Sequence, residues 1–427
     1  MAASTQSART GPVRTSLGWG SRLRTRIDEL GDLFAHPLAN YYLLIGSCVM
    51  LLGLGLLMVL SASSVDGYLH HGNSYYWEER QVMWLLVGLP AGWLTSRLPH
   101  SFIRRLAWPA LAISILLMIA TQTSLGVRVN GNQNWLALGP FQFQPAELAK
   151  FAMVVWGAHV YALKDKFLTG WKHLMVPVMV VFGVMVLLDI AGGDLGTAMV
   201  MLAIALGLLW TVGAPWPMFV VAISAVGAGV GTLAVTSPYR WQRITSFLHP
   251  FQDFQGTGWQ PAHGLLGIAS GGLFGRGIGA SQQKWGNLPE AHTDFIFAVL
   301  GEELGLIGTI FVLILFAVFA YSGIRVAIQA KDLWVRYTAT GIVVWIMAHV
   351  LINVGMVLAL LPVIGIPLPL VSYGGSSLVT ELLALGLLIG FARNDPTTLG
   401  ALRDRRRARR AGRQVNGFNA GLRGRRS

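Results

Sequence analysis

Charged residues and cysteine are scarce in this sequence. Only 12% of its 427 residues are Asp, Glu, Lys or Arg, about half the fraction found in a typical soluble domain. Acidic residues are the rarer class, 19 against 32 Lys and Arg, so an acid inside an apolar segment calls for an explanation. Cys48 is the single cysteine, which excludes an intrachain disulfide and a cysteine-rich metal site.

Long apolar runs are abundant instead. Hydrophobic residues make up 54% of the chain, and runs of about 20 residues recur, the length that crosses a bilayer as a helix. A helix satisfies its own backbone hydrogen bonds in lipid. The sequence therefore predicts an all-α polytopic membrane protein with ten transmembrane helices. The expected spans are 41–63, 80–98, 105–122, 145–163, 174–191, 195–213, 216–236, 300–323, 337–360 and 377–393.

The orientation follows from the placement of Lys and Arg, which favour the cytoplasmic side of a membrane. Alternate short connections hold nearly all of these cations, and the other short connections are almost free of them. Both chain ends are also basic. We therefore expect both ends in the cytoplasm (N-in, C-in). The cations in the short connections are Arg97, Arg104, Arg105, Lys164, Lys166, Lys172, Arg325, Lys331 and Arg336.

The expected organisation has three parts. A basic cytoplasmic segment, 1–40, precedes the ten-helix membrane domain, 41–395. An Arg-rich cytoplasmic tail, 396–427, is expected to be disordered and attracted to anionic membrane lipids. No aromatic platform or known nucleic-acid-binding fold accompanies the Arg run, so no nucleic-acid partner is expected. Two extracytoplasmic loops, about 123–144 and 237–299, can hold a site, and the larger one joins helices seven and eight.

The most informative stretch lies at the end of the larger loop, where ionisable residues meet an apolar helix. It reads Leu-Pro-Glu-Ala-His-Thr-Asp-Phe-Ile-Phe over 288–297 and continues into Gly-Glu-Glu-Leu-Gly. A charged residue at the centre of a membrane helix costs about 2.5 to 3.5 kcal/mol, so such residues usually mark chemistry or transport. Asp294 is therefore the leading candidate for a functional group.

Several separated motifs occur in order along the apolar part of the chain. They are Asn130-Gly131 with Trp135; Gln144-Pro145-Ala146-Glu147 with Lys150; Asp194-Leu195-Gly196-Thr197; a Gly-Leu-Phe-Gly run; His292-Thr293-Asp294-Phe295; Pro367-Leu368-Pro369; and Ser372-Tyr373-Gly374-Gly375-Ser376. Together they resemble the SEDS family, the shape, elongation, division and sporulation proteins of the FtsW/RodA type, over about 40–395. An Asn-rich stretch replaces the basic residues usual before Trp135, which favours the division branch, FtsW, over the elongation branch, RodA.

The resemblance implies a peptidoglycan glycosyltransferase of the bacterial cytoplasmic membrane. Such an enzyme polymerises lipid II into glycan strands at the outer face during septal synthesis and releases undecaprenyl diphosphate. Its implied partners are a class B penicillin-binding protein transpeptidase and other divisome membrane proteins. A lipid II flippase, a non-catalytic divisome scaffold and an elongation-type polymerase are the alternatives. Transporters tend to contain internal repeats with matching broken helices, and no convincing repeat relates the two halves here.

A diphosphate leaving group needs fewer acids than glycoside hydrolysis, in which a second carboxylic acid protonates the leaving oxygen. A diphosphate departs unprotonated when cations compensate its charge, so one base for the acceptor hydroxyl suffices. The family's essential loop aspartate matches Asp294, the expected base. No protein metal site is expected, but Mg²⁺ or Mn²⁺ is a candidate cofactor. The candidate cations are Arg240, Arg243 and Lys284 on the same loop, and Lys150 in the fourth span.

The other candidate site residues each have a structural alternative. Glu147 and Lys150, three residues apart on a helix, either line a diphosphate and sugar cavity or form a buried ion pair. His292 either contacts substrate or serves as a hydrogen-bonding residue of the loop. Trp135 either stacks on a sugar or lies at the headgroup layer. Ser376 or Ser377 is expected to cap the last helix and contact phosphate.

Further polar residues have mainly structural interpretations. Asp194, Glu302 and Glu303 lie near expected helix starts, where carboxylates complement the helix dipole. Glu381 in the last span has no assigned role. Prolines and glycines over 362–369 break the helical pattern between the last two spans, which predicts a re-entrant or partly buried loop.

Overall fold

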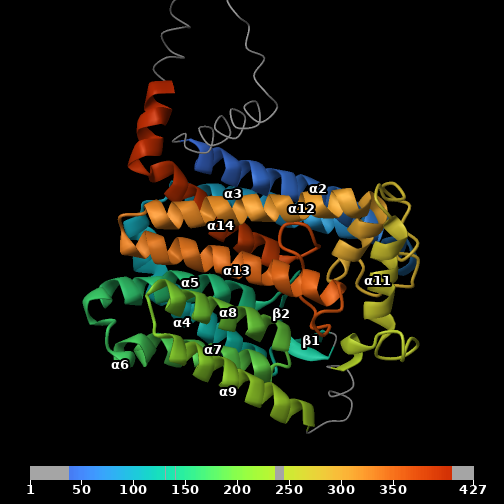
Figure 1. Cartoon of the computed structure of the whole chain (residues 1–427), viewed down its shortest axis with the longest axis horizontal. Helices are drawn as coiled ribbons and strands as arrows, with labels where there is room; N and C mark the ends of the chain where they lie inside the picture. The colour runs from blue at the N-terminus through green and yellow to red at the C-terminus, as the bar shows by residue number, and fades with distance from the viewer. Residues whose placement is uncertain (1–37, 130, 140, 236–244, 406–427) are drawn as a thin grey trace, which may run out of the picture.

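The computed structural model is a bundle of long helices with a small sheet and a folded loop at one end (Figure 1). It describes residues 38–129, 131–139, 141–235 and 245–405. Six helical stretches in this part of the chain are long and apolar enough to cross a membrane. They are α2 (Ala39–His71), α4 (His100–Thr121), Trp171–Ala191, α12 (Ile296–Gln329), α13 (Leu333–Val357) and α14 (Ser376–Asn394). The chain is thus a mostly helical, multi-pass membrane protein.

Four further helices coincide with the remaining predicted spans. They are α3 (Tyr76–Arg97), α5 (Pro145–Leu163), α8 (Leu195–Thr211) and α9 (Trp216–Val235). Each of the ten predicted apolar runs therefore overlaps a helical stretch. The stretch Trp171–Ala191 is divided into α6 (Trp171–Leu174), η2 (Met175–Met179) and α7 (Val180–Ala191). The count of ten membrane crossings stays a prediction.

Glycines let the backbones of α3 and α14 approach closely in the bundle. A Cβ on Gly386 of α14 would lie 2.0 Å from the carbonyl oxygen of Gly92 in α3. A Cβ on Gly92 would lie 2.5 Å from the carbonyl oxygen of Leu382. Small residues are a common basis of helix packing in membranes, because lipid supplies no hydrophobic driving force between helices.

The all-α prediction is wrong for the first outside loop. Residues of the expected loop 123–144 form an antiparallel sheet of β1 (Gly126–Val129), β2 (Asn132–Leu138) and β3 (Phe141–Phe143). The sheet is tied to the turn between α7 and α8 by a 2.8 Å hydrogen bond from Gln133 N–H to the Gly192 carbonyl. Strands this short have weak sequence signals, and neighbouring helices supply the packing that they need.

The larger loop is also folded. It contains η3 (Ser246–Leu248) and α11 (Trp259–Gly271), and it packs on the beginning of α12. Gly305 interrupts α12 with φ +69°. A Cβ there would lie 2.3 Å from the backbone nitrogen of Gly275 in the Gly-Leu-Phe-Gly run, so the close approach of loop and helix requires glycine.

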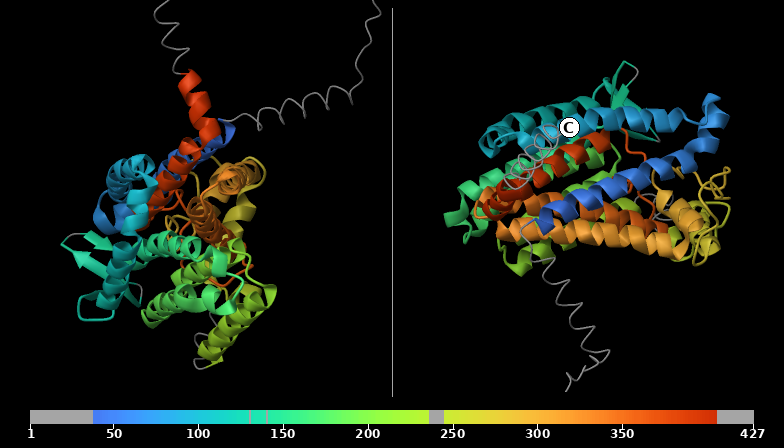
Figure 2. Two further views of the ribbon diagram at one scale, coloured as in Figure 1. Left: turned by 90° about the vertical axis from the view of Figure 1, so that its left-hand side faces the viewer. Right: turned by 90° about the horizontal axis from the view of Figure 1, so that it is seen from above.

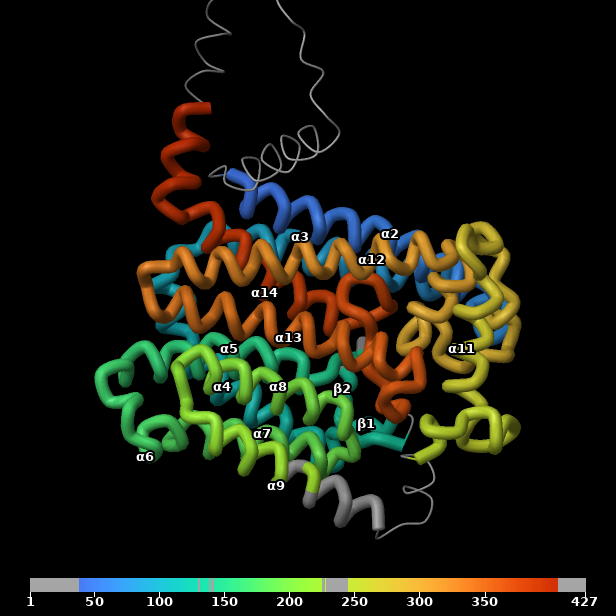
Figure 3. The backbone as a smooth tube through the Cα atoms, viewed as in Figure 1, coloured from blue at the N-terminus to red at the C-terminus, as the bar shows by residue number. Residues whose placement is uncertain are grey.

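The chain between α13 and α14 is irregular and partly buried, as predicted (Figure 3). Within it, Ile366, Leu368, Leu370 and Val371 are buried in the core. Such backbone at membrane depth is tolerated where protein covers it. This segment brings its polar groups beside the larger loop.

The described ends of the chain lie at one end of the bundle, away from the sheet and α11 (Figures 1 and 2). The described part of the expected disordered tail, 396–405, is helical, which corrects the prediction for those residues. Arg405 Nη1 donates a 2.9 Å hydrogen bond to the Tyr42 hydroxyl of α2. This contact connects the start of the tail to the first helix, an interaction that sequence reasoning did not consider.

Candidate active site

A cavity of about 2130 Å³ occupies the end of the bundle that carries the sheet and the larger loop. Residues of α2, α3, β2, α5, α8 and α13 line it together with the loops before α12 and α14. Of the predicted site residues, the cavity brings together Trp135, Glu147, Lys150, Lys284, His292 and Asp294. Segments far apart in sequence therefore contribute to one cavity.

The backbone around Asp294 is held by three hydrogen bonds from elsewhere in the bundle. The carbonyls of residues 292, 293 and 294 accept, in that order, from Tyr373 N–H at 2.9 Å, Ser372 Oγ at 2.6 Å and Asn353 Nδ2 at 2.7 Å. The Asp294 side chain is half-buried and lines the cavity. These bonds fix the backbone from which the Asp294 carboxylate extends.

Asn353 connects two loops at this site. Its side-chain nitrogen also donates a 2.7 Å hydrogen bond to the Ile366 carbonyl, and the side chain is fully buried in α13. The neighbouring Gly365 has φ +72°, and a Cβ there would lie 3.3 Å from Asp294 Oδ2. The two loops are thus held together where the carboxylate faces the cavity.

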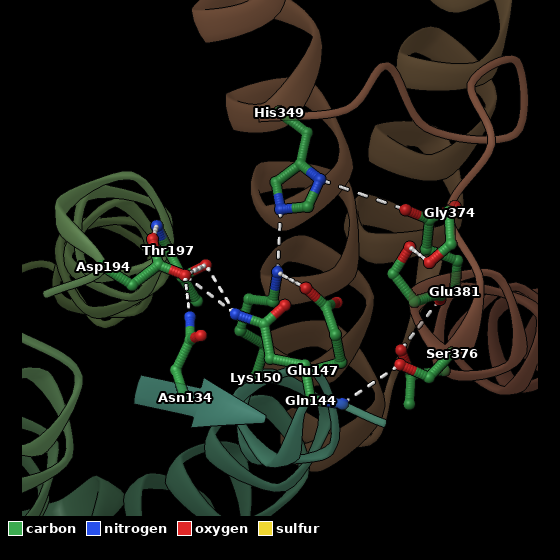
Figure 4. A network of polar contacts seen from close by, with 12 residues as sticks. Asn134, Gln144, Glu147, Lys150, Asp194, Thr197, His349, Gly374, Ser376 and Glu381 are labelled. Carbon is green, nitrogen blue, oxygen red and sulfur yellow. Dashed lines mark hydrogen bonds and ion pairs between the residues drawn. The ribbon is translucent and has the colours of Figure 1, made fainter. Parts of the chain in front are cut away.

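Lys150 lies between a carboxylate and an imidazole (Figure 4). Its Nζ donates to Glu147 Oε1 at 2.8 Å and contacts His349 Nε2 at 3.0 Å. An ammonium only donates, so His349 Nε2 accepts and the ring proton is on Nδ1. His349 Nδ1 lies 3.9 Å from Glu381 Oε1. The buried ion pair is therefore present, and both of its residues also line the cavity.

Glu381 has a structural position although the sequence suggested no role. Its Oε2 accepts a 3.2 Å hydrogen bond from Leu370 N–H in the segment before α14, while its other oxygen faces His349. A row of polar side chains, Lys150 on α5, His349 on α13 and Glu381 on α14, therefore runs from the cavity into the bundle. Such buried polar groups are costly unless they are paired.

Asp194 caps α8, as expected, and also lines the cavity. Its Oδ1 accepts from Thr197 N–H at 2.8 Å. Its Oδ2 accepts from Asn134 Nδ2 of β2 at 2.6 Å and from Gln144 Nε2 at 2.8 Å. These contacts position the sheet against the N-terminus of α5, which begins with Pro145.

Three other predicted residues have defined surroundings. Trp135 is half-buried and lines the cavity from β2. His292 is buried, with its ring centroid 4.9 Å from that of Trp77, and burial lowers the pKa of its imidazole. Ser376 accepts a 3.2 Å hydrogen bond from Gln144 N–H. The predicted cap is wrong, because Gly375 occupies the N-cap position of α14 without a side-chain bond.

The helix-dipole interpretation of Glu302 and Glu303 is also wrong. Both precede the break at Gly305, so they lie at the end of the first α12 segment. Glu302 accepts from the backbone N–H groups of Gln282 and Gln283, at 3.0 and 3.3 Å. Two carboxylates therefore hold the loop against the helix.

Lys284 is paired rather than free. Its Nζ lies 3.5 Å from Glu303 Oε1 and donates to the Ser61 carbonyl at 3.2 Å. It still contributes to the cavity wall. Arg240 and Arg243, the other cations expected from this loop, lie outside the described residues.

Sequence reasoning missed four residues of the site: Trp77, Arg80, His349 and Asn353. Arg80 lines the cavity from α3, with its guanidinium 4.6 Å from the centroid of the Tyr76 ring. For Arg80, His349 and Asn353 the signal that could have found them is a polar residue inside an apolar run, since such a residue usually has a partner or a function. Arg80 lies at the beginning of the expected span 80–98, and His349 and Asn353 lie inside 337–360.

Comparison with known proteins decides the family. The model of a family described as cell cycle protein, FtsW/RodA/SpoVE, matches residues 42–396. The chain belongs to the FtsW/RodA/SpoVE family. A probable peptidoglycan glycosyltransferase FtsW of Mycobacterium tuberculosis is 38% identical over 399 residues, covering 93% of this chain and 76% of that protein. Stage V sporulation protein E of Bacillus subtilis is 38% identical over 355 residues, covering 82% and 96%.

Two solved structures have a similar fold. A chain from a peptidoglycan synthase complex, described for its coordination of polymerization and crosslinking, matches with a TM-score of 0.68 and 26% identity, covering 83% of this chain and 97% of that one. The rod shape determining protein RodA of Thermus thermophilus matches with a TM-score of 0.62 and 27% identity, covering 83% and 97%. The cavity is therefore built on the RodA fold.

Proposed function

We propose that this protein is an FtsW-type peptidoglycan glycosyltransferase that polymerises lipid II into glycan strands and releases undecaprenyl diphosphate. The observation that carries the proposal is the half-buried Asp294 in the wall of a large cavity that Lys150 also lines. Three hydrogen bonds to the backbone carbonyls of residues 292–294 hold the segment that carries it. The family supplies the reaction class, and the relatives named peptidoglycan glycosyltransferases support it.

In the proposed mechanism Asp294 is the general base. It takes the proton from a sugar hydroxyl of the acceptor lipid II as that oxygen attacks the anomeric carbon of the growing strand. The bond from this carbon to the diphosphate oxygen breaks, and the diphosphate leaves with both electrons. No acid is needed, because a diphosphate leaves as an anion when positive charge faces it.

Lys150 and Arg80 are the proposed cations for the diphosphate. Both line the cavity from the wall formed by α5 and α3. Glu147 and His349 hold the Lys150 ammonium at 2.8 and 3.0 Å, which limits its movement. Trp135 is proposed to face a sugar ring, since an aromatic face suits the apolar side of a sugar.

A divalent cation stays a prediction. In the part of the chain that the structure describes, no three His, Cys, Asp or Glu side chains gather as in a metal site. The proposed steps use side chains of the protein and do not pass through a metal.

We also propose the ten-span topology with both chain ends in the cytoplasm. The overlap of each predicted run with a helix supports it, as does the placement of the described chain ends away from the cavity. The cavity would then face the outer side, where the resemblance places polymerisation. A class B penicillin-binding protein and other divisome proteins are the proposed partners at the division septum, and relationship to a chain from a peptidoglycan synthase complex supports the first.

The test is lipid II polymerisation in liposomes by the purified protein with its transpeptidase partner. Asp294→Asn is compared with the wild type and with Asp66→Asn. Asp66 is another carboxylate of the cavity, and its Oδ2 accepts a 2.7 Å hydrogen bond from Trp77 Nε1. We expect no strands from Asp294→Asn, whereas Asp66→Asn keeps a substantial rate. All three proteins must unfold at similar temperatures and bind the partner equally.

Equal product from Asp294→Asn and wild type would remove Asp294 as the base. If neither protein makes strands but both translocate fluorescent lipid II across liposomes, the flippase alternative replaces the polymerase. A protein that does neither, while still assembling its partner, would be a scaffold.

A further inference from the structure

A second, smaller pocket lies at the other end of the bundle, away from the Asp294 cavity. Its volume is about 390 Å³, and it is formed where α4 begins, α5 approaches its end and α13 begins. In the proposed topology this is the cytoplasmic end. Nothing in the proposed polymerase reaction uses it.

Four lining residues come from one face of α4. Ser101, Arg104, Arg105 and Trp108 follow the spacing i, i+3, i+4 and i+7, which places side chains on the same side of a helix. Two guanidinium groups therefore lie one turn from an indole. Trp108 is 53% exposed, as is common for tryptophan at the headgroup layer.

The Arg104 side chain is oriented by a histidine of α5. Its Nε donates a 3.0 Å hydrogen bond to His159 Nδ1. A guanidinium only donates, so Nδ1 accepts and His159 is neutral with its proton on Nε2. No hydrogen bond from the terminal Arg104 nitrogens, or from Arg105, reaches another residue in the described ranges. These donors are available to a ligand.

The charge of the pocket suits a phosphate. Its one carboxylate, Asp332, is the N-cap of α13 and already accepts a 2.9 Å hydrogen bond from Trp334 N–H. The two arginines outnumber this carboxylate, so positive charge is in excess. Planar guanidinium groups match phosphate oxygens in bidentate geometry.

The surface beside the pocket is apolar. On α4, Phe102 and Leu106 are each 45% exposed, and Ile113 and Leu116 farther along the helix are also exposed. An acyl chain could lie along these residues while its headgroup occupies the pocket. Basic pockets between helices on the cytoplasmic side of a membrane commonly bind anionic lipid headgroups.

We propose that this pocket binds the phosphate of an anionic phospholipid of the inner leaflet, with Arg104 and Arg105 as its ligands and Trp108 beside the headgroup. Free phosphate shares the headgroup chemistry but would not use the apolar face of α4. The site would couple the protein to the lipid composition of its membrane.

Native mass spectrometry of the full-length purified protein tests the proposal by titration with phosphatidylglycerol, phosphatidylcholine or inorganic phosphate. The double variant Arg104→Gln/Arg105→Gln is compared with Arg97→Gln/Arg325→Gln, which removes the same charge from other basic connections. We expect phosphatidylglycerol affinity to fall about tenfold or more in the pocket variant and less in the control.

Ser101→Asp is a second variant, chosen because a carboxylate near a helix N-terminus favours folding. It should weaken phosphatidylglycerol binding through repulsion while leaving the unfolding temperature near the wild-type value. The site would be overturned if phosphatidylglycerol affinity fell equally in the Arg104→Gln/Arg105→Gln variant and in its control. It would also be overturned if neither that variant nor Ser101→Asp lost affinity. Displacement of the lipid by millimolar inorganic phosphate with the same dependence on Arg104 would overturn the lipid assignment.

Discussion

Two buried Lys–Glu pairs border the cavity, and they differ in how the chain makes them. Lys150 and Glu147 belong to one helix, are three residues apart and lie 2.8 Å from each other. Lys284 and Glu303 come from a loop and a helix and are 3.5 Å apart. The first pair follows from helical spacing, whereas the second depends on the folding of a loop. The comparison separates a local ion pair that lines the cavity from a long-range pair that holds a loop.

Removing the ammonium of the local pair should have the largest effect on stability. Lys150→Met leaves Glu147 buried without its cation, and breaking one partner of such a pair costs about 3 to 5 kcal/mol. We expect a lower unfolding temperature in detergent and loss of polymerisation. In the double variant Lys150→Met/Glu147→Gln most of the stability should return while activity stays low. If Lys150→Met unfolded at the wild-type temperature, the Lys150–Glu147 pair would not contribute to stability.

Neutralising the acid of the long-range pair should have a smaller effect. Glu303→Gln removes the ion pair with Lys284, although an amide oxygen can still accept from the Ser61 hydroxyl, which lies 2.6 Å from Glu303 Oε1. The loss of one charged hydrogen bond is worth about 1.5 to 3 kcal/mol. Limited proteolysis should then cut the loop 272–284 faster. If cleavage and unfolding are unchanged, Glu303 does not hold the loop through its charge.

The hydrogen bonds of Asn353 at Asp294 extend the comparison of the two ion pairs, because they position a loop through an uncharged side chain. Asn353→Ala leaves the carbonyls of Asp294 and Ile366 without their 2.7 Å donor, a loss of about 1 to 3 kcal/mol for a buried group. Since the base is displaced, kcat should fall more than KM rises. Asn40→Ala, which removes the 3.0 Å bond to Gln329, is the matched control and should leave kcat unchanged.

The smallest effect is expected from Ser376→Ala. It removes one neutral hydrogen bond, to Gln144 N–H at 3.2 Å, worth about 0.5 to 1.5 kcal/mol. Polymerisation should remain near the wild-type rate, because Ser376 does not line the Asp294 cavity. A large rise in KM for lipid II would instead restore the predicted phosphate contact.

The residue pattern determined the helical architecture, because a membrane restricts the secondary structure that an apolar segment can adopt. An apolar run of about 20 residues satisfies its backbone in lipid only as a helix, and each predicted run overlaps one. The local pair of Glu147 and Lys150 and the cap by Asp194 were also predictable, since both depend on residues three apart. The family resemblance singled out Asp294, and the family match supports that resemblance.

Tertiary structure alone decided what depends on separate segments meeting. The sheet over 126–143 forms against the α7–α8 turn, the backbone of Asp294 depends on Asn353 and Ser372, and Glu302 and Glu303 bind a loop instead of a helix terminus. These hydrogen bonds join residues 20 to 79 positions apart. The packing of the whole bundle decides which residues pair in this way. The spacing of residues in the sequence does not show which distant residues will become neighbours.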